Sequence, residues 1–437
     1  MKNVYKIAIA VAVAAVFAVS AVVGFFSSSS AGKWTGEFVA KKASEALGCP
    51  VTVESISVED FNTVFINNIA LYDKQAEKMA EAKKAEVSLR LFSALSSSPE
   101  AAVSKVKVIS PVAYLTVKED GKTNIEDIEV SGEGESAFDG TIEIEDGTVY
   151  GDYAGKKAEL RNVNGSLYIK GSDMEFDAAA NNFDAKIVAE GELKDSVNLN
   201  IEGENIEIEN YREFLAILHE KDILSKDIEI VSGKIPTVKA EINKTDKVIN
   251  FKGKAEVENG RVNVYDTIIE AIAGNVAFSQ DELLIDAKAT ANEQKAQVAG
   301  RIAFGDGSPS MDLAVKSEAF DINKVFPKVP VNGAIKVDGK ITGSFATPQI
   351  EANLYQESGE VMDVVLRNTK VQARMLGTKL LIDRASTHIF DGDVEGEGKL
   401  DVKDLAFTAH VKGNHLRAEY LANFLPDIRG ALRGCIA

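Results

Sequence analysis

The residue types that bind metals or act as nucleophiles are scarce in this chain of 437 residues. It has four histidines, His219, His388, His410 and His415, and two cysteines, Cys49 and Cys435. Four residues separate His410 from His415, which is not the i, i+4 spacing of a zinc-binding helix. Two cysteines are too few for a disulfide framework or a thiolate metal site. We therefore expect surface histidines, a buried thiol at Cys49 in preference to a lipoprotein acylation site, no metal centre and no cofactor.

Acidic residues offer two weaker signals. The run Asp391-Gly-Asp393-Val-Glu395 begins like a calcium-binding loop, but position twelve is Val402 and not a bidentate glutamate, so a tight turn is preferred. The pairs Glu143 with Glu145 and Glu207 with Glu209 repeat every two residues, as on the solvated face of a strand. No nucleophile elbow, phosphate-binding loop or dinucleotide fingerprint is present. These observations predict a protein that is not an enzyme.

Composition limits the class further. Lys and Arg number 49 against 67 Asp and Glu, for a formal net charge of -18, and 45% of the residues are apolar. Nucleic-acid binding needs clustered basic residues, and no basic stripe occurs. The apolar share is high enough for a sizeable buried core.

The N-terminus carries a membrane-insertion signal. Lys2 and Lys6 precede residues 7–26, which are uncharged and long enough, at 1.5 Å per residue, to cross about 30 Å of hydrocarbon. A cleaved signal peptide is the alternative, but its apolar region is usually shorter. We predict a cytoplasmic stub and transmembrane anchor over residues 1–32, with everything after residue 26 outside that membrane.

A short helix is expected over residues 33–47, because Trp34, Phe38 and Leu47 recur on one side. Gly48 and Pro50 form the usual helix-ending signal. Trp34 and the nearby lysines suit a membrane interface, whereas a capping helix packed on the next domain would show the same pattern. Both interpretations stay open at this point.

After Pro50 the dominant apolar period is two, which indicates strands with one dry and one wet face. Clear examples are Val51-Thr-Val-Glu-Ser-Ile-Ser-Val58, Thr141-Ile-Glu-Ile-Glu145, Val197-Asn-Leu-Asn-Ile201, Ile206-Glu-Ile208 and Ala334-Ile-Lys-Val-Asp338. Hairpin-type dipeptides separate such runs at Asp120-Gly121, Asp139-Gly140, Asp146-Gly147, Asn164-Gly165, Asn259-Gly260, Asp306-Gly307, Asn332-Gly333, Asp338-Gly339 and Asp391-Gly392. Helical spacing is confined to residues 75–85, which also fit a strand edge, and to 91–95, 211–218 and 420–425.

An internal repeat is visible in the apolar spacing. A Val or Ile is followed by apolar residues at offsets 5, 7 and 10, starting at Ile201, Val315 and Val411. Each copy changes from strand to helical spacing, which predicts a helical turn that caps a strand at Tyr211, Val325 and Leu421. Repeats of this kind favour an extended stack of strands.

A series of short segments follows one another along the chain. They are the anchor and helix, Val51-Thr-Val-Glu-Ser-Ile-Ser-Val58, Phe65-Ile-Asn-Asn-Ile-Ala-Leu-Tyr-Asp73, Ala85-Glu-Val-Ser-Leu-Arg-Leu91, Ile109-Ser-Pro-Val-Ala-Tyr-Leu-Thr-Val117, Glu119-Asp-Gly-Lys-Thr-Asn-Ile125, and Gly339-Lys-Ile-Thr-Gly343 with Thr347-Pro-Gln-Ile350. In this order, these segments resemble the AsmA-like family, in particular its TamB branch. Each motif is common in β-repeats, so the resemblance depends on their order.

The resemblance implies an inner-membrane anchor with most of the chain in the periplasm, forming an elongated, repetitive antiparallel β-sheet folded into an apolar groove, with a few short helices. Residues 33–130 would hold the short helix and the first β module, and residues 131–437 the β-groove. TamB-like proteins are usually much longer, which suggests a truncated chain or a short member. The implied partners are phospholipids, the inner membrane and, through a missing C-terminal region, a BamA-like outer-membrane barrel, with no nucleic acid.

The expected function is intermembrane phospholipid transport and outer-membrane biogenesis. A structural or adhesive β-scaffold with a packed core is the main alternative, because alternation requires a dry face in both cases; an assembly factor for outer-membrane proteins without lipid carriage is another. The residues expected to represent the groove lining are Leu199, Ile201, Val262, Val264, Ile335, Val337 and Ile341.

Overall fold

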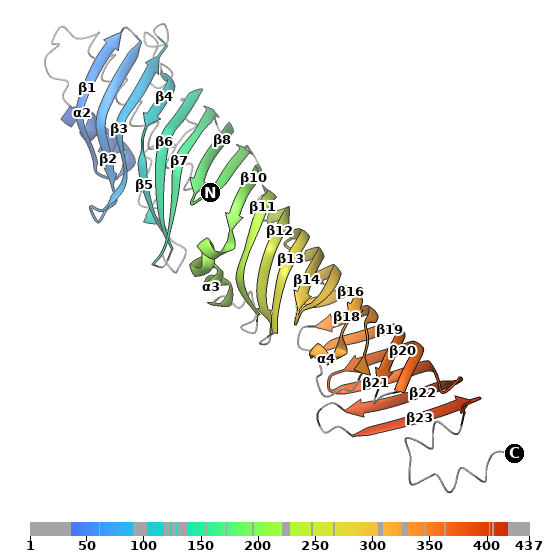
Figure 1. The fold of residues 1–437 in the computed structure, drawn as a ribbon. Helices are drawn as coiled ribbons and strands as arrows, with labels where there is room; N and C mark the ends of the chain where they lie inside the picture. The colour runs from blue at the N-terminus through green and yellow to red at the C-terminus, as the bar shows by residue number, and fades with distance from the viewer. Residues whose placement is uncertain are drawn as a thin grey trace, which may run out of the picture. The chain divides into compact units, whose positions relative to one another are not determined.

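The computed structural model confirms a mainly β protein (Figure 1). It describes residues 36–60, 62–90, 103–117, 123–124, 128, 139–153, 155–171, 173–194, 196–220, 228–245, 248–264, 267–304, 309–325, 331–344, 347–361, 364–401, 403 and 406–417. These residues form 23 strands in a mixed, largely antiparallel sheet, with a few short helices. The chain divides into unit 1, residues 1–216 and 236–251, and unit 2, residues 217–235 and 252–437.

Unit 1 begins with α2 (Gly36–Leu47) and contains the first ten strands. They are β1 (Val51–Asp60), β2 (Thr63–Tyr72), β3 (Lys78–Leu89), β4 (Val103–Ile109), β5 (Val112–Val117), β6 (Asp139–Tyr153), β7 (Lys156–Lys170), β8 (Asp173–Asn182), β9 (Ala185–Leu193) and β10 (Ser196–Glu207). A 3₁₀ turn, η3 (Ile208–Tyr211), follows β10 and leads into α3 (Arg212–Glu220). Two further strands, β11 (Ile228–Thr245) and β12 (Val248–Val264), contribute residues to both units.

Unit 2 continues with β13 to β23 and one helical turn. The elements are β13 (Thr267–Ser279), β14 (Glu282–Ala291), β15 (Gln294–Ala303), β16 (Ser310–Phe320), α4 (Ile322–Val325), β17 (Val331–Asn332), β18 (Ile335–Ser344), β19 (Pro348–Val361), β20 (Val364–Leu376), β21 (Lys379–Ile389), β22 (Gly392–Asp401) and β23 (Phe407–Asn414). From β12 to β16, then β18 to β23, each strand pairs antiparallel with the next.

The predicted membrane anchor at residues 7–26 lies outside the described residues, as do the expected helical segments 91–95 and 420–425. Among the residues that the structure describes, no helix has both the length and the apolar character to cross a membrane.

The helix predicted over residues 33–47 is observed as α2, and it packs on the first strands of unit 1. Ala43 and Leu47 of α2 are fully buried in a cluster with Val51 and Met79, and Cys49 is 2% exposed in the same cluster. The buried thiol expected at Cys49 is therefore confirmed. Gly48 follows the helix with φ of 64°, the left-handed conformation that ends many helices.

The structure settles one open alternative and corrects one expectation about local structure. Residues 78–89 form strand β3, so helical spacing in residues 75–85 was misleading and the strand alternative holds. The sheet is also not purely antiparallel, because β4 and β5 both pair in parallel with β6. Parallel neighbours need a crossover connection, which the 21 residues between Val117 and Asp139 supply in place of a tight hairpin.

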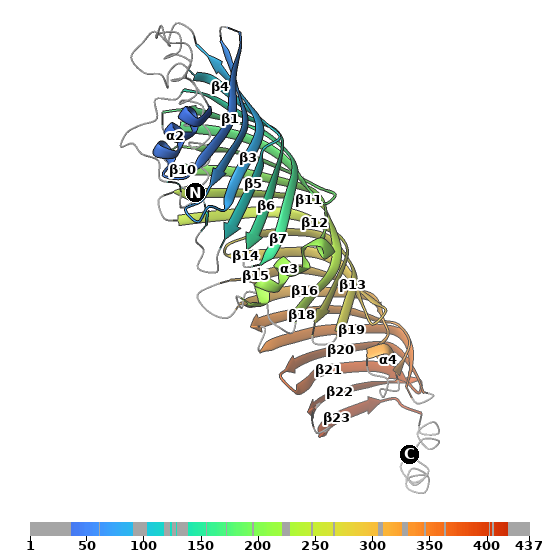
Figure 2. The same cartoon turned by 90° about the vertical axis from the view of Figure 1, so that its left-hand side faces the viewer.

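Most of the described Asn-Gly and Asp-Gly dipeptides do not mark hairpins. Asp146 and Asn259 have φ of 55° and 52° but lie inside β6 and β12, where the pairing register shifts. They form β-bulges, which bend and twist a strand, and the long strands of unit 2 curve visibly (Figure 2). Asp391-Gly392 is a hairpin turn as predicted. The dipeptides at 120–121 and 306–307 lie outside the described residues.

Three other dipeptides also sit within strands. Asp139-Gly140 opens β6, Asn164-Gly165 lies in β7, and Asp338-Gly339 lies in β18. Asn332 ends β17, and Gly333 lies between β17 and β18. The signal failed because tolerance of positive φ, or the lack of a side chain, is needed in bent and closely packed strands as well as in turns.

The predicted repeat is present in the described part of the chain. Tyr211 lies in η3 directly after β10, and Val325 ends α4 directly after β16, while Leu421 lies outside the described residues. In each copy a hairpin turn touches the segment that follows the third strand of the copy. Phe183 meets Tyr211 edge to face, Glu293 pairs with Lys324, and Asp391 pairs with Arg417 at 3.1 Å.

Candidate functional site

One face of the sheet in unit 2 is apolar along its whole described length. Because cross-strand partners share a face, the pairing traces continuous rows that run from strand to strand. The large-residue row passes through eleven strands and consists of Ala255, Val276, Ile285, Gly300, Leu313, Ile341, Ile350, Met375, Leu380, Leu400 and Phe407. No polar side chain interrupts it.

A second row lies two residues away on the same strands and is equally apolar. This small-residue row consists of Val257, Gly274, Ala287, Val298, Val315, Gly339, Ala352, Ala373, Ile382, Gly398 and Ala409. Seven of its eleven members are Gly or Ala, so most of its side chains are small, and we call this row the lane of small residues. On its other side lie Val337, Leu354 and Val371, which are also cross-strand partners.

The apolar face of unit 2, defined by these rows, is only partly removed from solvent. Among the apolar residues described in unit 2, just three are buried, namely Ala287, Leu313 and Ile335, at 7 to 9% exposure. The other members whose side chains are described are half-buried except Ala409 on β23, which is exposed, and Val411 on the same strand is 69% exposed. A face packed in its own core would bury most of these side chains.

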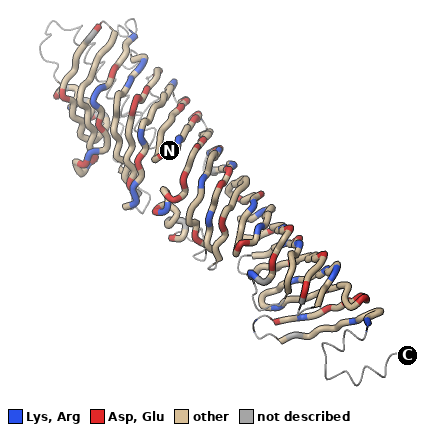
Figure 3. The backbone as a smooth tube through the Cα atoms, viewed as in Figure 1, with Lys and Arg blue, Asp and Glu red and all other residues tan. Residues whose placement is uncertain are grey.

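The opposite face carries charges of both signs. Figure 3 shows that basic and acidic residues both recur along the strands of unit 2. Cross-strand ion pairs join Lys340 to Asp312 at 3.0 Å and Arg374 to Asp383 at 2.6 Å. The hydrogen bonds from Arg374 lower the pKa of the Asp383 carboxyl, although both side chains are exposed. The second face is therefore an ordinary charged, solvated surface. The apolar face is the unusual one, because its apolar side chains are partly exposed.

Unit 1 has two corresponding rows, and their burial changes along the sheet. The first is Val58, Val64, Val87, Val106, Ile142, Leu167, Phe176, Gly191 and Leu199, and the second is Ile56, Ile66, Ala85, Val108, Ile144, Gly165, Ala178, Ala189 and Ile201. Val64, Val87 and Val106 are at most 1% exposed and form the main core cluster. Leu199 and Ile201, at the far end of the rows, are half-buried.

The seven predicted lining residues fall into separate groups. Leu199 and Ile201 end the two rows of unit 1, while Ile341 belongs to the large-residue row of unit 2 and Val337 lies beside the small-residue row. Ile335 is buried at 7% exposure, so it belongs to the packed margin of the face. Val262 and Val264 follow the bulge of β12 and pair with Ile269 and Thr267.

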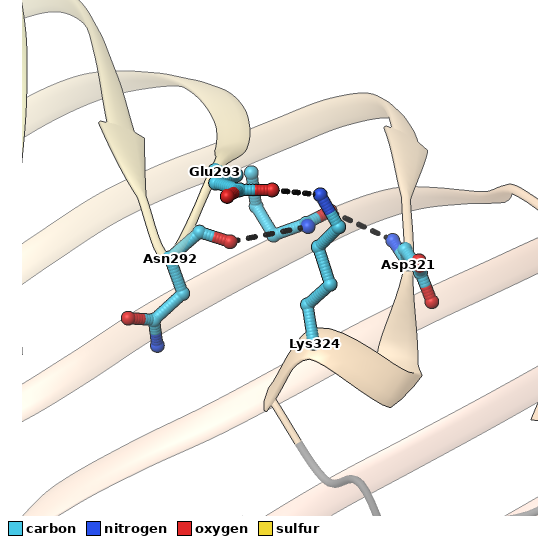
Figure 4. A network of polar contacts seen from close by, with 5 residues as sticks. Asn292, Glu293, Asp321 and Lys324 are labelled. Carbon is cyan, nitrogen blue, oxygen red and sulfur yellow. Dashed lines mark hydrogen bonds and ion pairs between the residues drawn. The ribbon is translucent and has the colours of Figure 1, made fainter.

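Buried amides at one margin of the face were not anticipated from the sequence. Gln294, 6% exposed, accepts a hydrogen bond from the backbone N–H of Asp321 at 2.8 Å and donates to the Asn292 carbonyl at 3.3 Å. Beside it, Lys324 of α4 faces Glu293 (Figure 4). Gln356, 4% exposed, donates to the Asn332 carbonyl at 3.1 Å. The sequence does contain a signal for these amides: each glutamine stands at a position where the alternation of its strand calls for an apolar residue.

The acidic residues that the sequence analysis considered for metal binding or acid–base chemistry lie in turns, in ion pairs or at strand ends. Asp393 contacts His388 at 3.0 Å, and Glu395 contacts Arg384 at 3.3 Å, so the calcium-like run begins at a tight turn and its acids have side-chain partners. Within the described residues no cluster of His, Cys, Asp and Glu is arranged to hold a metal ion. Glu143 pairs with Lys105 at 2.7 Å on the wet face, as expected. Glu209 lies in η3, so the second acidic pair does not share one strand.

The histidines are only partly as expected. His410 and His415 are exposed and His388 is 39% exposed, which agrees with surface positions. His219 of α3 is half-buried, and its Nδ1 is buried without a hydrogen-bond partner in the described structure.

Comparisons with known proteins gave no match: no family model, no curated protein and no solved structure resembles this chain at a significant level. The apolar face is therefore the feature of this chain that bears on its function.

Proposed function

We propose that this chain is a membrane-anchored lipid carrier, in which the apolar face of the sheet shelters acyl chains and conducts phospholipid between two membranes. The observation that carries the proposal is the pair of uninterrupted apolar rows across eleven strands of unit 2, whose members are mostly half-buried. An exposed apolar surface of this extent is unfavourable in water and marks a binding surface.

Hydrocarbon is the occupant that these rows suit best. The rows carry no charge and no hydrogen-bonding side chain, so they offer no pattern by which a particular folded partner would be recognised. Each acyl CH₂ removed from water contributes about 0.8 kcal/mol without directional contacts. The uncharged residues 7–26 would hold the chain at a bilayer, which is the source of such chains.

The resemblance to AsmA-like proteins of the TamB branch extends this proposal. It implies an anchor in the inner membrane and a sheet in the periplasm that forms a groove, with roles in phospholipid transport and outer-membrane biogenesis. A BamA-like barrel protein would be the outer-membrane partner. The same proposal assigns the chain no catalytic role and no nucleic-acid partner.

A structural β-scaffold remains the second candidate, and one observation favours it for part of the chain. Val64, Val87 and Val106 are fully buried, so the apolar face at β2 to β4 is packed as a scaffold would require. The two hypotheses differ for unit 2, where a scaffold needs a protein layer over the face and a carrier needs lipid.

The proposal is tested by lipid extraction and mass spectrometry on the purified full chain and on two variants. Val337→Asp puts a carboxylate among the apolar residues of the face, where desolvation is costly, and we expect it to lower the recovered phospholipid strongly. Ala314→Asp is the control, because Ala314 is exposed on the wet face and its cross-strand partner is Lys340.

Lys336 is a less suitable control position than Ala314. Its Nζ pairs with Glu318 at 2.7 Å, so Lys336→Asp would also create a repulsion. Absence of phospholipid from the wild-type chain, or equal recovery from Val337→Asp and Ala314→Asp, would reject lipid carriage in favour of the scaffold.

A further inference from the structure

The two margins of the apolar face of unit 2 differ in polarity. Beyond the large-residue row lies one more row of cross-strand partners near the turns, which we call the margin row. It consists of Gly253, Phe278, Leu283, Ile302, Met311, Gly343 and Pro348. All seven are apolar and none is buried, and Phe304, which follows Ile302 in the same alternation, is 43% exposed. On this side, the open margin, the apolar surface continues to the strand ends.

The opposite margin, from the row of Val337 outward, is polar and closed. In the described part of unit 2 all buried polar side chains lie on this side, namely Gln294, Ser317 and Gln356. Each of them hydrogen-bonds the backbone, and Ser317 donates to the Lys295 carbonyl at 2.8 Å. A Cβ at Gly333 would lie only 2.8 Å from Gln356 Nε2. This side, the amide margin, is therefore close-packed, and its buried side chains are already hydrogen-bonded.

Such an asymmetry suits an amphipathic ligand with one polar end. A charged head at the amide margin would have to be buried among these groups, whereas at the open margin it stays in water. Along β18 the lane of small residues, at Gly339, lies four residues inside the margin row, at Gly343, which is about 13 Å. One acyl chain fills half of the ~30 Å hydrocarbon core of a bilayer, or about 15 Å. Acyl chains can therefore reach the lane while the head stays at the open margin.

We propose that phospholipid enters and leaves the apolar face of unit 2 laterally across the open margin, with its head group in water beside Ile302 and Phe304 and its acyl chains on the rows behind them. The proposal rests on the lipid-carrier function. It adds to that function a side of entry and a fixed orientation of the lipid, in which the amide margin takes no part in exchange.

The first measurement locates the two ends of the lipid on the wild-type full-length chain. The protein is stripped of lipid and loaded from phosphatidylcholine vesicles whose lipid carries a photoactivatable group either on the head or at the end of an acyl chain. Adducts are located by mass spectrometry of peptides. We expect head adducts to be at least about ten-fold more frequent on residues 279–283, 302–304 and 347–348 than on residues 292–294 and 354–358, because burial of a charged head is costly. Acyl-end adducts should lie on the rows themselves.

A matched pair of exposed positions tests the same orientation through lipid selection. Phe304 lies at the open margin, and Val411 lies in the row of Val371, next to the amide margin. They are 43% and 69% exposed, so a lysine at either position leaves the buried core intact. Wild type, Phe304→Lys and Val411→Lys are loaded from vesicles of phosphatidylcholine and phosphatidylglycerol with identical acyl chains. We expect the bound phosphatidylglycerol-to-phosphatidylcholine ratio to rise about three-fold in Phe304→Lys, as for one exposed ion pair, and to stay at the wild-type value in Val411→Lys.

The possible results separate this inference from the function on which it rests. Head adducts concentrated at the amide margin overturn the proposed orientation alone, as does an unchanged ratio in Phe304→Lys or an equal rise in Val411→Lys with lipid still bound. Failure of the wild-type chain to bind any lipid overturns the carrier function and the orientation together.

Discussion

Filling the lane of small residues should separate lipid binding from stability, and Gly339 is the position for the test. A Cβ at Gly339 would lie 3.3 Å from the Glu351 carbonyl oxygen and 3.7 Å from that of Val315, so the backbone needs only a small adjustment. At Gly274 a Cβ would overlap the Asp286 carbonyl oxygen, which makes that glycine unsuitable. Gly339→Ile therefore adds a side chain to the lane without breaking β18.

The expected effects on folding and on binding have different signs. Glycine within a strand costs roughly 0.5–1 kcal/mol relative to alanine, and β-branched residues favour strands, so Gly339→Ile should leave stability unchanged or raise it by up to about 1 kcal/mol. If the side chain displaces two or three methylenes of a bound acyl chain, binding loses about 2 kcal/mol at about 0.8 kcal/mol per CH₂. That loss is roughly a 30-fold weaker local affinity.

Site-specific photocrosslinking at Ile350, beside the lane in the large-residue row, measures local lipid occupancy, and urea unfolding measures stability. Thr342→Ile is the control, since Thr342 lies on β18 in the opposite phase, facing Asp312 and Gln349. We expect crosslinking to fall in Gly339→Ile and to persist in Thr342→Ile. If Gly339→Ile is stable and a crosslinker at Ile350 still captures lipid at the wild-type level, the hypothesis that acyl chains lie along the lane of small residues is refuted.

Two other predictions concern the contacts that hold the strand ends and the wet face. Gln294→Met leaves the Asp321 N–H without its buried acceptor, which should cost about 1–3 kcal/mol locally and speed hydrogen exchange of that amide about 5- to 150-fold. Gln297→Met, on the exposed face, should leave the exchange of the Asp321 amide unchanged. Equal exchange rates of this amide in both variants would contradict the role of Gln294. Because hydrogen bonds from Arg374 lower the pKa of Asp383, the contribution of this pair is present above the pKa of an unfolded aspartate and lost as pH falls through the lowered pKa. NMR titration should show the Asp383 pKa rise in Arg374→Gln, and no change would disprove the coupling.

Alternation predicted the strands well because the period of side-chain exposure is a local property. Val51 to Val58 and Thr141 to Glu145 were assigned to strands from period two alone, and both lie in strands. The helical turns after β10 and β16 were also predicted from a change of period. Residues 78–89 show the limit, since a charged strand paired on both sides resembles a polar helix when its neighbours are unknown.

The bulges show a second limit of the sequence. Asn259-Gly260 has the composition of a hairpin turn, but the chain continues in the same direction through β12. A residue with positive φ reverses the chain only if the following residues pair back on the same strand. In β12 they pair with β13 instead, and such long-range pairing cannot be read from a dipeptide.

Burial is the property on which the functional question depends, and alternation does not encode it. Val87 and Val315 both occupy apolar phases of strands, yet Val87 is completely buried in the core of unit 1 and Val315 is half-buried in unit 2. The difference lies in what covers each face, which is a tertiary property.

The substance that covers the face is also what distinguishes the two hypotheses for unit 2. A scaffold would complete the face around Val315 with a second protein surface, so its stability would depend on protein concentration. A carrier would complete it with lipid, so its stability would depend on lipid at any protein concentration. The apolar rows are common to the scaffold and the carrier hypotheses. The function depends on whether protein or lipid covers these rows.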